Sequence, residues 1–104
     1  MASLFGIDTT RLHAIAAETR LRAVESQLSL GFTFCAIAET ELRFGRLNEV
    51  TKVVTKLRHH AEIIRLHIDE PGHLPTAAIP TLNDQLIALK ERTDKIEALL
   101  RRQR

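Results

Sequence analysis

Small and apolar residues recur in alternating steps of three and four over three long stretches of this chain, and this spacing limits what it can fold into. The first stretch has Leu21, Val24, Leu28, Gly31, Cys35, Ala38 and Leu42, the second Val50, Val54, Leu57, Ala61, Ile64 and Ile68, and the third Leu82, Leu86, Leu89, Thr93, Ile96 and Leu100. Such steps gather residues on one side of an α-helix, forming a heptad seam that packs against other helices. No competing pattern of period two indicates strands. The spacing therefore predicts an all-α antiparallel bundle.

Helix breakers separate these stretches. Gly45 suits the end of a first helix, because glycine adopts the left-handed backbone that often closes helices. Pro71 and Gly72 stop a second helix, because proline lacks the amide hydrogen that a helix interior needs. We expect one domain, 1–104, with helices at about 8–44, 47–69 and 78–102.

Two polar clusters resemble helix starts. Asp8, Thr9 and Thr10 offer side-chain oxygens that can accept the free amide hydrogens of a first turn. Thr81 to Asp84 resembles a capping box for the third helix, with Asp in place of Glu. The loop before it, residues 71–80, has room for one helical turn.

The first helix has a second apolar stripe, roughly opposite its seam. One three-helix hairpin covers only one of these two faces, so either the helix breaks near Gly31, giving a four-helix bundle, or a partner covers the excess. No proline supports a break, so we expect a homodimer. The expected interaction residues on this stripe are Leu12, Ile15, Leu30, Phe34 and Ile37. The seam of the third helix, through Leu89, is the other surface that could hold a dimer together.

Composition and charge exclude several classes of function. Fifteen basic against thirteen acidic residues give a charge of +2, which does not by itself argue for a polyanionic partner. A single cysteine forms no internal disulfide, residues 1–8 have neither the basic start nor the apolar run of a leader, and no run of about 20 apolar residues is present, so we expect a soluble cytoplasmic chain without membrane contact. The basic end, Arg101 to Arg104, could touch phosphate, but without Trp or Tyr to stack on bases, nucleic-acid binding is disfavoured.

Residues that could carry chemistry are scattered. His59 and Glu62 are one helical turn apart and could share a metal ion, whereas His60 and His67 are about 10.5 Å apart along the axis, too far to do so. Glu39 and Glu41 point in different directions, with Glu39 expected to pair with Arg43. Cys35 is on a seam and is expected to be a small buried side chain. We expect no catalytic residue, no metal and no cofactor.

Residues 34–54 resemble a single tetratricopeptide hairpin. Phe34 matches the large aromatic position, Ile37 and Ala38 the large and small pair, Gly45 the glycine between the helices and Val54 the large apolar position of the second helix. Short bacterial helical proteins look similar around such a hairpin. The resemblance implies a helical hairpin for protein interaction and no chemistry. We therefore expect a non-catalytic helical interaction module, with a metal-binding protein or enzyme using His59 and Glu62, or a nucleic-acid binder using the basic C-terminus, as alternatives.

Overall fold

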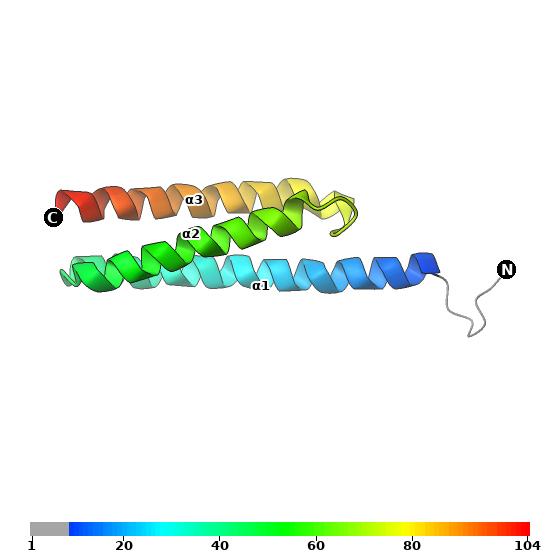
Figure 1. Ribbon diagram of the computed structural model, residues 1–104, viewed down its shortest axis with the longest axis horizontal. Helices are drawn as coiled ribbons and strands as arrows, with labels where there is room; N and C mark the ends of the chain where they lie inside the picture. The colour runs from blue at the N-terminus through cyan, green and yellow to red at the C-terminus, as the bar shows by residue number, and fades with distance from the viewer. Residues whose placement is uncertain (1–8) are drawn as a thin grey trace.

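Three helices packed side by side make up the computed structural model, which describes residues 9–104 (Figure 1). Helix α1 spans Thr9–Arg43, α2 spans Leu47–Asp69 and α3 spans Ile79–Arg102, with a short 3-10 turn, η1, at Thr76–Ala78. In Figure 1, α1 runs from right to left, α2 returns, and α3 runs in the direction of α1. The described residues contain no strand. Asp8, a candidate N-cap and the first residue of the expected helix, lies outside the described residues.

The three predicted heptad seams form the core. All of their residues are buried except Leu21 and Ala61, which are half-buried. Leu74, from the loop between α2 and η1, also joins this core, with 5% of its surface exposed. This loop is called the second loop below. The alternation of threes and fours in the sequence therefore corresponds to the inward side of each helix, as expected for bundle packing.

Helix α1 continues through Gly31 without a break, so the four-helix arrangement is wrong for the described residues. Gly31 lies against α3: a Cβ atom added to it would be 2.8 Å from Cδ2 of Leu89 and 3.2 Å from Cδ1. Glycine is thus used here for close packing of two helices, at a cost in helix propensity of about 1 kcal/mol.

The reversal between α1 and α2 is a Schellman motif. Gly45 has a positive φ of 73°, the backbone amide of Arg46 donates to the carbonyl oxygen of Glu41 at 2.9 Å, and that of Gly45 donates to Leu42 at 3.1 Å. These bonds satisfy carbonyl groups that the helix end leaves without partners. The turn follows from the glycine that the sequence places there.

The start of α3 differs from the capping-box expectation. Ala78 is the N-cap residue and makes no side-chain cap hydrogen bond, and Pro80 lies in the first turn. Thr81 is consequently inside the helix. Proline is well suited to a first helical turn because its missing amide hydrogen has no intrahelical partner there.

Candidate interaction surface

The N-terminal end of α1 projects beyond the other two helices (Figure 1). At 1.5 Å per residue, the 35 residues of α1 span roughly 52 Å, against roughly 35 Å for α2 and 36 Å for α3. Arg20 donates from Nε to the carbonyl oxygen of His73 at 2.6 Å, and Val24 is the first buried residue of α1. Residues 9–19, here called the overhang, are exposed or half-buried. Leu12 and Ile15 within it are 49% and 55% exposed.

A second heptad series follows the side of α1 opposite the core. It is uncharged from end to end, and we call it the outer face of α1: Leu12, Ala16, Thr19, Ala23, Ser26, Leu30, Thr33, Ile37 and Thr40. All of these residues except the half-buried Ala16 are exposed, with Leu30 and Ile37 each 44% exposed. A repeat of this kind is the pattern by which one helix packs along another.

The threonines of the outer face present methyl groups rather than free hydroxyls. Thr19 donates its hydroxyl hydrogen to the carbonyl oxygen of Ile15 at 3.0 Å, Thr33 donates to Ser29 at 3.1 Å, and Thr40 donates to Ala36 at 3.0 Å. Each hydroxyl is therefore satisfied within its own helix. A partner that covers this surface needs to supply no hydrogen-bond acceptor to them.

Of the six expected interaction residues, four are exposed, Phe34 is half-buried and Leu89 is buried. Leu12, Ile15, Leu30 and Ile37 are exposed, in agreement with an available surface. Phe34 is half-buried at the edge of the outer face, with its ring edge-on to the His60 ring at a centroid distance of 6.1 Å.

The expectation that Leu89 lies on an interaction surface is wrong. Its side chain is 0% exposed and lies against Gly31, so the seam of α3 packs inside the bundle and offers no surface to a partner. The wheel pattern of a lone helix cannot distinguish an intramolecular seam from an intermolecular one, because both show the same spacing.

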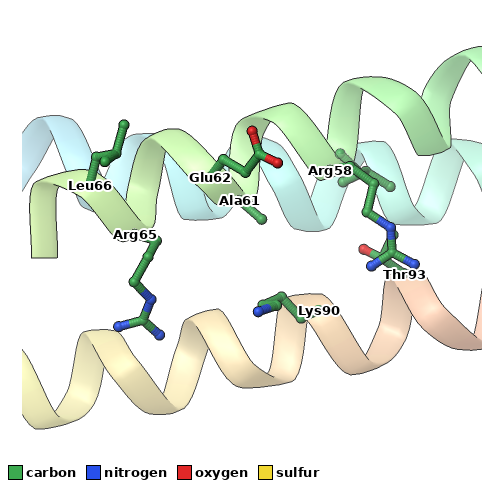
Figure 2. Close-up of a pocket in the computed structure, with 8 residues that line it drawn as sticks. Arg58, Ala61, Glu62, Arg65, Leu66, Lys90 and Thr93 are labelled. Atoms are coloured by element: carbon green, nitrogen blue, oxygen red, sulfur yellow. The ribbon is translucent and has the colours of Figure 1, made fainter. Parts of the chain in front are cut away.

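A groove of about 440 Å³ lies between α2 and α3 (Figure 2). Figure 2 shows Arg65 and Lys90 extending into it and Arg58 beside Thr93. The cationic groups of the arginines are already engaged, Arg58 with Asp94 and Glu97 and Arg65 with Asn83 and Asp69. The groove thus combines a partly apolar floor with charges that mainly join neighbouring helices.

An ion pair joins α1 to α3 beside the buried cysteine. Arg92 contacts both carboxylate oxygens of Glu39, with N–O distances of 3.0 and 2.5 Å, so the expectation that Glu39 pairs with Arg43 is wrong. This hydrogen bonding lowers the pKa of Glu39 and raises that of Arg92. Glu41 instead contacts Arg46 at 3.3 Å. A bidentate pair of this kind aligns two helices.

Cys35 lies beside this pair, fully buried, with its Sγ 3.9 Å from Oγ1 of Thr93. Burial raises the pKa of its thiol, although the Thr93 contact and the charge of Arg92 act in the opposite direction. A raised pKa disfavours the nucleophilic thiolate form. The geometry therefore suits a packing role.

Two of the histidines, His67 and His73, form a contact that the sequence did not indicate. Nδ1 of His67 is 2.8 Å from Nε2 of His73, whose Nδ1 is 3.1 Å from a carboxylate oxygen of Glu70. The second loop brings these groups together by folding back on α2. His59 and Glu62 are exposed on α2. Within residues 9–104, no three His, Cys, Asp or Glu side chains are grouped closely enough to hold a metal ion.

The basic C-terminal residues are partly engaged within the bundle. Arg101 donates to Glu97 at 2.9 Å, and Arg104 contacts the hydroxyl of Thr51. These contacts involve two of the three arginines that suggested phosphate binding.

Comparisons with known proteins return no family model, no curated protein and no solved structure that matches this chain. In the part that the structure describes, no helix has both the length and the apolar character needed to cross a membrane.

Proposed function

We propose that this chain is a non-catalytic helical interaction module that associates with itself as a homodimer through the outer face of α1. The observation that carries the proposal is the uncharged heptad series from Leu12 to Thr40, which lies in solvent on the helix side opposite the core. An uncharged surface with exposed Leu and Ile side chains along its length is typical of association sites, because soluble monomers rarely leave large apolar patches in contact with water.

The overhang supports the same proposal. Residues 9–19 extend a helix that is already nucleated, but most helical stability in proteins comes from tertiary packing of one face rather than from helix propensity. Residues 9–19 have little support from α2 and α3. A partner helix on the outer face covers Leu12 and adds the missing tertiary contacts.

The two alternatives have less support. The metal hypothesis has only His59 and Glu62 together on an exposed helix side, which is fewer ligands than a stable zinc site uses. The nucleic-acid hypothesis depends on terminal arginines, of which Arg101 and Arg104 have contacts within the bundle.

The test is the mass in solution, with two matched substitutions. We expect light scattering at micromolar concentration to give twice 11.7 kDa for the unaltered chain. Leu30 on α1 and Leu99 on α3 are each 44% exposed, so Leu30→Glu and Leu99→Glu change equally exposed leucines on different helices. Leu30→Glu is expected to give 11.7 kDa, and Leu99→Glu to keep the doubled mass. A monomeric unaltered chain, or equal effects of both substitutions, would contradict the proposal; far-ultraviolet circular dichroism controls for folding.

A further inference from the structure

We infer that the groove between α2 and α3 is a binding site for a small amphipathic anion, namely a carboxylate carried on a short apolar chain. The groove has a volume of about 440 Å³, within the range of roughly 300–1,000 Å³ that is typical of small-molecule sites, and such sites occur between the helices of bundles. The residues that line it are on α2 and α3, whereas the proposed dimer contact is on the outer face of α1. The inference is therefore independent of the proposed function.

Two small seam residues account for the hollow between the helices. The seam of α2 otherwise carries Val, Leu and Ile, and that of α3 carries Leu and Ile, but Ala61 and Thr93 interrupt them. Ala61 is the one seam residue of α2 that is half-buried rather than buried. Because larger core side chains normally fill the space between helices, these two short ones leave a groove that reaches down to Leu57 and has a mostly apolar lining.

Polar contacts join α2 to α3 at both ends of the groove. At one end Arg65 donates to the side-chain oxygen of Asn83 at 2.7 Å, and at the other Arg58 binds Asp94 at 2.7 Å (Figure 2). The two arginines are seven residues apart, which is about 10.5 Å along α2. A bounded groove of this length suits a short chain better than a partner helix.

The charges at the groove favour an anion. Lys90 extends into it, and no residue within 9–104 pairs with its ammonium group (Figure 2). Arg65 uses only Nη1 for its contacts to Asp69 and Asn83, so in the described part of the chain its Nε and Nη2 hydrogens have no partner. Glu62 also lines the groove, but Figure 2 shows its carboxylate directed away from α3. A lysine without an ion pair beside an apolar floor is complementary to a carboxylate with an apolar tail.

Titration of the isotope-labelled chain with octanoate, followed by amide chemical shifts in NMR spectra, tests the inference. Octanoate has one carboxylate and an unbranched apolar chain, and octyltrimethylammonium has a chain of the same length with the opposite charge. We expect saturable shifts centred on Ala61, Lys90 and Thr93 at millimolar octanoate. The cation should bind about tenfold more weakly or not at all, because it cannot accept a hydrogen bond from Lys90.

Two matched pairs of substitutions locate the site. Lys90→Gln should weaken octanoate binding about tenfold, whereas Lys95→Gln, which changes an exposed lysine of the same helix outside the groove, should leave it unchanged. Ala61→Leu should fill the groove and abolish the localised shifts, and Ala88→Leu, at an exposed position of α3, is its control. Far-ultraviolet circular dichroism establishes that each variant keeps its helix content.

Other outcomes overturn the inference. Equal affinity for octanoate and octyltrimethylammonium would mean that the groove does not select an anion, and shifts centred on the outer face of α1 would place the binding there instead. Unchanged octanoate binding by Lys90→Gln, or no saturable shift of the unaltered chain, would also refute it. If Ala61→Leu loses its helix content, the comparison of Lys90→Gln with Lys95→Gln still decides.

Discussion

Because Gly31 lies against Leu89, we expect the effect of Gly31→Ala on stability to depend on which residue occupies position 89. Gly31→Ala improves helix propensity by about 1 kcal/mol in a helix interior. In the unaltered chain, however, the new methyl group would lie 2.8 Å from Cδ2 of Leu89, inside normal contact distance. Leu89 is 0% exposed, so it has little room to move away. Overpacking of this kind typically costs about 1–3 kcal/mol, which cancels or exceeds the propensity gain.

Leu89→Ala removes the obstructing atoms and leaves a cavity, for which we expect a loss of about 2–5 kcal/mol in the free energy of unfolding. In that background, Gly31→Ala keeps its propensity gain and places a methyl group in the vacated space, worth about another 0.8 kcal/mol of burial. The double variant should therefore be more stable than Leu89→Ala alone by roughly 1–2 kcal/mol, whereas Gly31→Ala alone should be neutral or destabilising.

Urea unfolding followed by circular dichroism measures the four chains, at one fixed concentration so that association contributes equally. The quantity of interest is the coupling free energy of the double-mutant cycle, which cancels effects that each substitution has independently. Equal stabilisation by Gly31→Ala in both backgrounds, giving a coupling near zero, would refute the close approach of α1 and α3 at this point.

Three further predictions concern single positions. Leu57 is 1% exposed and His59 is exposed, so Leu57→Ala should lower the free energy of unfolding by about 2–5 kcal/mol, whereas His59→Ala should change it by less than about 0.5 kcal/mol. Equal losses in urea unfolding would mean that the two residues do not lie on the inner and outer sides of α2. Because Arg92 lowers the pKa of Glu39, the Glu39 carboxylate stabilises the fold above its unfolded pKa, near 4.5, and this stabilisation is lost as the pH falls through the lower folded pKa. Glu39→Gln should therefore make the melting temperature less sensitive to acid pH. Cys35 should react with a thiol reagent only at the rate of unfolding, and rapid labelling of the folded chain would contradict its burial.

The inward side of each helix was predictable because heptad spacing is a local property. Val54, Leu57 and Leu86 are buried for the same reason that they were identified, namely that their neighbours along the seam, three and four positions away, are also apolar. The glycine turn at Gly45 was predictable because few other residues adopt its backbone conformation readily.

The partners of polar side chains were not predictable in this way. Glu39 is one turn from Arg43 on the same helix, yet its carboxylate binds Arg92, 53 positions along the chain, because α3 lies closer to that side of α1. Leu74 becomes part of the core only because the loop before η1 folds inward. The threonine hydroxyls of the outer face reach carbonyl oxygens of their own helix only in certain side-chain rotamers, which the sequence does not specify. The apolar stripe predicted from the sequence therefore did not include these threonines.

The single row of buried side chains contributed by each helix has a consequence for local opening. In a bundle with one inward seam per helix, each core layer contacts mainly the layers immediately above and below it. Opening can therefore progress from the ends with the loss of one layer at a time, as in other elongated arrays. Amide hydrogen exchange should then be graded along the long axis, fastest in the overhang and slowest near Leu57 and Leu89, where layers persist on both sides.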